Sequence, residues 1–145
     1  MSIREILISE EGYKLSVYKD IFGNYTVGVG HLILDSDNIP RVEGHTISSD
    51  MVEFLFNSDL AIAIRGIEHL LTEDVYSVLC GSKKCALLNM IFNLGYSHMS
   101  HFRLMLSAIR IGDHVTAGKE ILNSLAAHQL PGRYHRIFNM YMKET

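Results

Sequence analysis

Side chains that could carry acid and base chemistry gather in the first 31 residues of this 145-residue chain: Glu10, Glu11, Asp20, Thr26 and His31. Two carboxyl groups in different surroundings are what glycoside hydrolysis requires. One must be protonated to donate to the leaving oxygen, and the other must be ionised to attack or to orient a water. A hydroxyl beside the second carboxylate, such as that of Thr26, could help to position that water. Spacing alone does not single out this chemistry, because pairs of acids near a hairpin are common.

Local sequence patterns predict the elements that hold these residues. Apolar residues at helical spacing predict a short helix over residues 1–11. Alternating β-branched and aromatic residues with glycines predict a β-hairpin or a small three-stranded sheet over residues 13–34, with a turn at Gly23-Asn24. Residues 35–46 are polar and predict a loop with one further short strand around Arg41–Glu43.

The chain from Ser48 onward predicts helices throughout. The expected boundaries, in chain order, are a long amphipathic helix from Ser48 to Leu71, a helix from Thr72 to Gly81-Ser82, an apolar helix ended by Gly95, short helices near 102–110 and 113–127, and a last helix opened by Pro131. We therefore expect an α+β, mainly α, protein.

This pattern indicates one domain over residues 1–145 with two lobes. Residues 13–48 would form a small β lobe, and residues 49–145 a helical lobe on which the first helix, residues 1–12, would pack. A cleft between such lobes is the first place to look for a site.

The triplet Glu11-x8-Asp20-x5-Thr26, set in SEEGYKLSVYKDIFGNYTVGVGHL, resembles the catalytic segment of the phage-type lysozymes, glycoside hydrolase family 24. The similarity covers essentially the whole chain, and the triplet in its glycine-rich frame is too specific for chance to be a good explanation. Further similar segments follow in the same order: His45–Asp50, Phe56–Ile67, Cys85–Gly95 and Gln129–Arg133.

The resemblance implies a lysozyme-like fold and a muramidase. Such enzymes cleave the β-1,4 bond between N-acetylmuramic acid and N-acetylglucosamine in peptidoglycan, with inversion and without a cofactor or metal. By the same resemblance, Glu11 is the general acid, Asp20 binds or activates the attacking water, and Thr26 helps to hold that water. Leu32 and Phe92 match positions that line the family's sugar cleft. Inversion implies carboxyl groups roughly 6.5–9.5 Å apart.

The chain departs from the family at several points. Met105 and Glu120 stand at two cleft positions that are small or amide side chains in the family, so those roles are not carried over. The loop after the hairpin is shorter than in close relatives, which predicts a missing short helix and a more open cleft. Close relatives are strongly basic, whereas this chain has a net charge of −3.

His31 has two interpretations. It could serve as a catalytic base, or it could be structural and pair with an acid on the next helix, for which Asp59 is the candidate. The other histidines lack the tight spacing to acids or cysteines that metal sites show, so we expect them on the surface. Cys80 and Cys85 are expected to be free thiols.

Two arginines near the C-terminus are candidates to support the acids. Glu10 should point away from Glu11, because adjacent helix positions diverge, and we expect it to pair with the helix that carries Arg133 and Arg136. Arg133 is the better candidate to lie near Glu11, where its charge would lower the pKa of that carboxyl while burial would raise it.

The composition of the chain argues against several other classes of protein. The chain lacks the basic excess of a nucleic-acid binder, and it has neither a membrane-spanning apolar run nor a secretory signal. Protonation of its eight histidines would reverse the sign of its net charge, which predicts a pH optimum below neutral.

We therefore expect a monomeric phage or prophage endolysin that contacts peptidoglycan glycan strands, with no nucleic-acid partner and no stable membrane insertion. It would accumulate in the host cytoplasm and reach the periplasmic peptidoglycan through a pore-forming holin, a delivery step that the resemblance implies. The alternatives are a virion-associated or interbacterial-effector muramidase, and an inactive lysozyme-fold protein that binds glycan.

Overall fold

The computed structural model describes residues 1–144 of the chain. It contains two compact units, one formed by Met1–Ala61 and the other by the residues from Ile62 onward. The division falls inside a long helix rather than at residues 48–49, and the first helix belongs to the same unit as the sheet. The packing of residues 1–12 on the helical lobe stays a prediction.

The first helix, α1, spans Ile3–Glu11, close to the predicted range. Its first turn is capped by the Ser2 hydroxyl, which accepts a hydrogen bond from the Glu5 amide at 3.1 Å. It ends at Gly12, whose φ of +85° suits glycine. An Arg4–Glu53 ion pair joins α1 to the next long helix. The end of α1 thus leaves Glu11 as its last residue.

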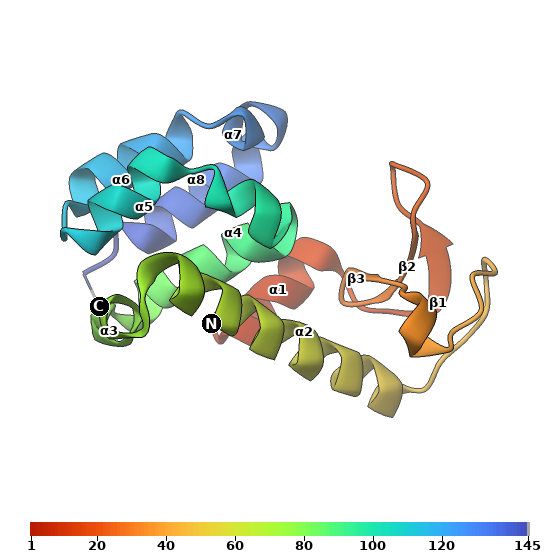
Figure 1. Ribbon diagram of the computed structural model, residues 1–145. Helices are drawn as coiled ribbons and strands as arrows, with labels where there is room; N and C mark the ends of the chain where they lie inside the picture. The colour runs from red at the N-terminus through yellow and green to blue at the C-terminus, as the bar shows by residue number, and fades with distance from the viewer. Residues whose placement is uncertain (145) are drawn as a thin grey trace. The chain divides into compact units, whose positions relative to one another are not determined.

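A three-stranded antiparallel sheet in the order β1-β2-β3 follows, as the sequence predicted (Figure 1). Its strands are β1 Lys14–Lys19, β2 Tyr25–Gly28 and β3 His31–Leu32. Thr26 in the central strand lies opposite Tyr18 on one side and Leu32 on the other. This register brings two of the predicted site residues, Thr26 and Leu32, directly beside one another.

The prediction of a short strand around Arg41–Glu43 is wrong. A short 3-10 helix, η1 Asp35–Asp37, opens this loop, and the residues that pair with β1 lie further along the chain. The Val17 amide donates to the His45 carbonyl at 2.8 Å, and Thr46 forms an isolated bridge with Ser16. Glu43 instead belongs to a turn that Gly44 completes at a φ of +86°. This pairing depends on long-range register, which local composition does not report.

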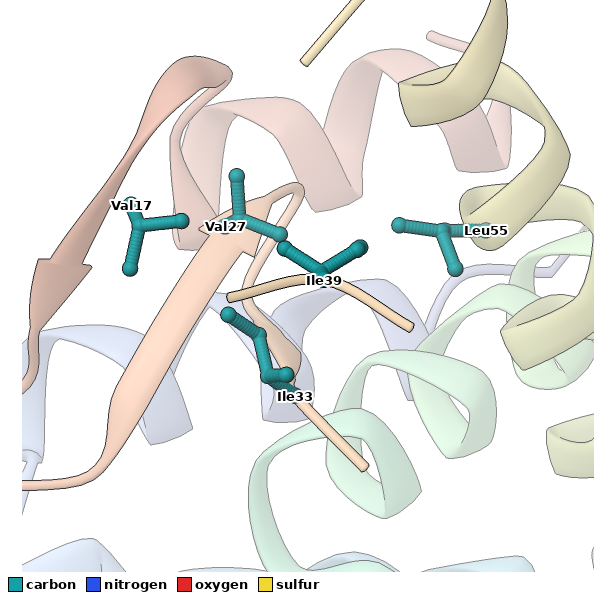
Figure 2. Packing of buried hydrophobic residues seen from close by; sticks show 5 residues of the cluster. All are labelled: Val17, Val27, Ile33, Ile39 and Leu55. Atoms are coloured by element: carbon teal, nitrogen blue, oxygen red, sulfur yellow. The ribbon is translucent and has the colours of Figure 1, made fainter. Parts of the chain in front are cut away.

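Five buried side chains form the core of the first unit: Val17, Val27, Ile33, Ile39 and Leu55. Figure 2 shows them converging from the sheet, the following loop and α2, which spans Ser49–Leu71. Gly28 permits this packing, since a Cβ there would lie 3.3 Å from Cγ1 of Val52 on α2. The sheet is therefore held against the first half of α2 by apolar burial, about 1.5–3 kcal/mol for each fully buried aliphatic side chain.

The second unit is helical (Figure 1). After α2 its helices are α3 Glu73–Val78, α4 Gly81–Ser100, α5 Arg103–Arg110, α6 His114–Leu122, α7 Leu125–Gln129 and α8 Pro131–Tyr141. Helix α8 packs against α4, α6 and α7, and α5 packs against α6. Two buried tyrosines anchor α8, because Tyr134 donates to Oδ1 of Asn93 at 2.8 Å and the Tyr141 hydroxyl bonds to Nδ1 of His114 at 2.6 Å.

Two helix boundaries differ from the prediction, and the predicted end at Gly95 does not. Gly81 begins α4 rather than ending α3, since Cys80 before it is extended. The backbone of Gly95 is not helical, with a φ of +80°, so the apolar first part of α4 ends there as predicted and a second helical part follows it. The helix predicted over 113–127 is two helices, because the Ser124 hydroxyl accepts the Ala127 amide and caps a new one. The start of the last helix at Pro131 is confirmed.

Candidate active site

Asp20 lies at the start of the β1–β2 turn, which folds around its side chain. The amides of Phe22 and Asn24 both donate to Oδ1 of Asp20 at 2.9 Å. Such an Asx-type turn is why Asp suits this place, and Gly23 takes the positive φ that the turn needs. The hydrogen bond from the Asn24 amide, with help from those of Phe22 and the Asn24 side chain, lowers the pKa of Asp20 below its ordinary value despite some desolvation. Asp20 is therefore an anion at neutral pH.

Thr26 is connected to Asp20 through one carbonyl group. Its side chain is buried, with 5% exposed, and its hydroxyl donates to the Asn24 carbonyl at 3.0 Å. The same carbonyl accepts the Asp20 amide at 2.9 Å. Because the Thr26 hydroxyl gives its proton to Asn24, it presents a lone pair to any neighbouring donor.

Glu11 packs against the turn between β2 and β3. Its Oε1 is buried, and a Cβ built on Gly30 would lie only 2.5 Å from its Oε2. Gly30 also has a φ of +62°. A glycine at this position therefore makes room for the carboxyl group, which explains part of the glycine-rich frame seen in the sequence.

Tyr18 is affected by the charges of both acids, and sequence reasoning missed it. Burial raises the pKa of the Tyr18 hydroxyl, and the negative charges of Glu11 and Asp20 raise it further. The Tyr18 hydroxyl is thus within electrostatic range of both Glu11 and Asp20. Two signals could have found Tyr18: it precedes Asp20 by two positions, and it faces Thr26 across the hairpin.

His31 is buried between two carboxylates. Its Nδ1 lies 2.7 Å from Oδ2 of Asp59, the expected partner, and its Nε2 lies 2.7 Å from Oδ2 of Asp37, which sequence reasoning missed. Burial acts to lower the pKa of His31, but the hydrogen bonds to Asp59 and Asp37 outweigh it and raise the pKa to about 8. Both ring nitrogens are engaged, so this geometry favours a structural role over that of a catalytic base.

The remaining predicted residues lie apart along the chain. Leu32 on β3 is half exposed, with 50% accessible, and Phe92 is half buried on α4. The Arg133 guanidinium donates from Nε to Oδ1 of Asn89 at 3.0 Å, and Arg136 is exposed on α8. The pairing of Glu10 with α8, the approach of Arg133 to Glu11 and the shared cleft of Leu32 and Phe92 stay predictions.

Comparison with known sequences decides the family. The model of the phage lysozyme family matches residues 8–136, most of the chain. The chain belongs to the phage lysozyme family. This lysozyme, a glycoside hydrolase, is 36% identical to "Probable T4-type lysozyme 2" of Dictyostelium discoideum, over 99% of this chain and 95% of that protein. It is 33% identical to "Probable T4-type lysozyme 1" of the same organism, over 96% of this chain and 92% of that protein.

A third relative is a larger protein, and the match covers only part of it. The lysozyme is 33% identical to the "Pre-baseplate central spike protein Gp5" of Enterobacteria phage T4, over 94% of this chain but 27% of that protein. The family and the observed helices and sheet together confirm the expected lysozyme-like α+β fold.

Met105 and Glu120, which the sequence predicted to depart from the family, line a cavity in the helical unit of this lysozyme. Its volume is about 620 Å³, and α4, α5, α6 and α7 all contribute to its wall. Met105 is fully buried and Glu120 half buried. The cavity thus has an apolar interior with a carboxylate at its edge.

Two further features concern ions and membranes. Within residues 1–144, no three histidine, cysteine or acidic side chains gather in a way that could hold a metal ion. Among the helices of that same range, none has both the length and the apolar character that crossing a membrane requires.

Proposed function

We propose that this lysozyme hydrolyses the β-1,4 bond between N-acetylmuramic acid and N-acetylglucosamine in peptidoglycan, with inversion at the anomeric carbon. Glu11 is the general acid, Asp20 is the carboxylate that binds and activates the water, and Thr26 helps to hold that water. The proposal is supported by the link from Asp20 to Thr26 through the Asn24 carbonyl, together with the packing of Glu11 against Gly30.

The proposed reaction needs one proton donor and one proton acceptor. Glu11 donates its proton to the glycosidic oxygen as the bond to the anomeric carbon breaks. A water attacks that carbon from the opposite face, and Asp20 takes the proton that the water loses. The hydrogen bonds that lower the pKa of Asp20 suit a group that must be ionised before the water attacks.

Thr26 suits the role of a water-positioning group because its hydroxyl proton is already committed to Asn24. It therefore accepts a hydrogen bond from the water, whose other hydrogen faces Asp20. This leaves the water's lone pair free to attack the sugar. We also propose that Leu32 and Phe92 contact the sugar rings of the bound strand.

The direct test is to digest purified peptidoglycan with the wild-type protein and with Glu11→Gln. We expect new reducing ends on N-acetylmuramic acid and an initial product with the inverted anomer by NMR, and no product from the variant. Glu5→Gln, on an exposed turn of the same helix, is the control and should retain activity. New reducing ends on N-acetylglucosamine, or a retained anomer, would contradict the proposal.

We infer that the biological role is that of an endolysin, acting as a monomer on the wall after a holin opens the inner membrane. The similarity to a central spike protein favours one second candidate, a wall-cutting part of a virion. Immunoblots of purified virions and of the remaining lysate distinguish the two roles. An endolysin is found in the lysate, and a virion component sediments with the particles.

A further inference from the structure

The tip of the β1–β2 hairpin carries two large apolar side chains that the fold does not use. Ile21 is 92% exposed and Phe22 is 81% exposed, and neither belongs to the core cluster of the first unit. Turns of this kind ordinarily carry polar residues or glycine. The hydrogen bonds of this turn come from the Asp20 side chain and from backbone groups, so the side chains of Ile21 and Phe22 have no role in forming it.

The tip is fixed directly to the carboxylate that is proposed to handle water. The Phe22 amide donates to Oδ1 of Asp20 at 2.9 Å, and the Gly23 amide donates to the Asp20 carbonyl at 3.0 Å. The backbone of Phe22 therefore keeps a constant distance from the Asp20 side chain. A substrate that reaches Asp20 must come close to the residues that adjoin it in this turn.

We propose that Ile21 and Phe22 are positioning residues, which hold the apolar face of a sugar ring of the glycan strand beside Asp20. This inference rests on the proposed function. One face of a pyranose ring presents C–H groups, and N-acetyl groups add a methyl. Aromatic and branched aliphatic side chains pack against such surfaces, with an aromatic ring supplying a large contact area.

The charge of the chain favours an apolar contact of this kind. A net charge of −3 gives the protein no general attraction to an anionic wall at neutral pH. The lysine nearest in sequence is Lys19, whose Nζ lies 3.9 Å from Oε1 of Glu43 and over the Tyr25 ring, so it adds little free positive charge at the tip. Two apolar side chains therefore supply local affinity that does not depend on salt.

The test compares Phe22→Ser and Ile21→Ser, singly and together, with the matched control Phe54→Ser. Phe54 is an exposed phenylalanine of the same unit, with 65% accessible, and it lies on α2. Soluble, uncrosslinked glycan strands are the substrate. For the double variant we expect KM to rise about five- to tenfold with kcat within twofold of wild type, and for Phe22→Tyr we expect a KM near that of wild type. Phe54→Ser should change neither constant.

Binding supplies a second readout that does not need turnover. In a Glu11→Gln background, the double variant should bind insoluble peptidoglycan about five- to tenfold more weakly at both 0.15 and 0.5 M NaCl. Unchanged unfolding midpoints would show that the variants fold, as the exposure of both side chains leads us to expect.

Several outcomes overturn the inference, and they are separable from failure of the proposed function. Unchanged KM and binding in the double variant, or an equal loss in Phe54→Ser, leaves the muramidase intact and removes the role of the tip. Loss of binding to anionic lipid vesicles, or of a dimer in solution, without loss of glycan binding would assign the tip to a membrane or to a second copy. A wild-type protein that neither binds nor cuts glycan overturns both proposals.

Discussion

At the scale of single residues, the two proposed catalytic acids are held in different ways. Asp20 accepts amide hydrogen bonds from its own turn, so a local motif fixes its position and charge. Glu11 ends a helix and packs against Gly30, which comes from a different element. A change at Gly30 should therefore affect Glu11 and leave Asp20 in place.

Gly30→Ala should reduce kcat at least about a hundredfold, because the new Cβ would displace the Glu11 carboxyl from its position. The substitution also forces alanine into a left-handed conformation, at a cost of about 1–2 kcal/mol. Gly44→Ala is the matched control, since Gly44 has a φ of +86° with no atom near its missing Cβ. If both variants lose activity equally, the close approach to Glu11 is not the cause.

Thr26→Val should lower kcat by about a hundredfold while the fold is retained, because valine has the same shape without the hydroxyl that accepts from the water. The Asn24 carbonyl also loses one donor, so the free energy of unfolding should fall by about 1 kcal/mol. Thr26→Ser keeps the hydroxyl and should keep most of the activity. Steady-state kinetics beside thermal unfolding of both variants measures the two effects, and an active Thr26→Val would argue against a water-holding role.

At the scale of elements, three segments meet at His31. The residue itself is on β3, Asp37 ends η1, and Asp59 is on α2, so one imidazole ring joins all three. The Leu34 amide also donates to Oδ2 of Asp37 at 2.7 Å, which fixes η1 around the ring. The stability of this junction depends on the charge of His31.

The contribution of the His31 ion pairs to the free energy of unfolding should change with pH in a defined direction. The folded-state pKa of His31, about 8, lies above its ordinary value of 6.5, so its stabilisation is complete below about pH 6.5 and is lost as the pH rises through 8. Burial acts to raise the pKa of Asp37, but the bond to His31 and the Leu34 amide lower it overall. The contribution of Asp37 is therefore present above its ordinary pKa of 3.8 and is lost on acidification below that value.

His31→Asn should thus cost about 2 kcal/mol more unfolding free energy at pH 5.5 than at pH 9. Chemical denaturation at the two pH values measures this difference, with His135→Asn as a surface control. In Asp37→Asn, NMR titration should show a His31 pKa below that of the wild type. A cost of His31→Asn that is independent of pH would contradict the charged junction.

The boundary between α6 and α7 depends on a single cap. Ser124→Ala removes the hydroxyl that accepts the Ala127 amide and should lower the free energy of unfolding by about 1 kcal/mol. Ser107→Ala, on the exposed face of α5, should change it little. Equal unfolding midpoints for the two variants would show that the cap does not stabilise α7.

At the scale of the whole molecule, we expect the net charge of the protein to affect how readily it binds its substrate. The eight histidines are not equivalent, because the pKa of His31 is raised to about 8 and that of His114 is lowered by burial and by the Lys83 charge. His31 is therefore already charged at neutral pH, and the pKa of His114 lies below its ordinary value.

Peptidoglycan hydrolysis should be faster below neutral pH than above it, because the protein becomes less negative while Asp20 stays ionised. Initial rates on purified wall from pH 5 to 8 measure this, and the advantage at low pH should shrink as salt rises from 50 to 200 mM. A flat or alkaline profile would show that general charge does not limit the encounter.

Local chemistry determined much of this protein from its sequence alone. Helix α1 and its end at Gly12, the hairpin around Gly23-Asn24 and the start of α8 at Pro131 are each set by neighbouring residues, and all were predicted. The acid–acid–threonine triplet was predicted from the resemblance to the phage-type lysozymes, because spacing alone does not single it out, and its catalytic role stays a proposal.

Only the tertiary structure decided the contacts between segments distant in sequence. It showed that Gly30 makes room for Glu11, that Asp37 is the second partner of His31, and that residues 44–47 rather than Arg41–Glu43 pair with β1. These contacts depend on strand register and on how elements approach one another. Both are set by the sum of core packing across the chain, which no local pattern of residues records.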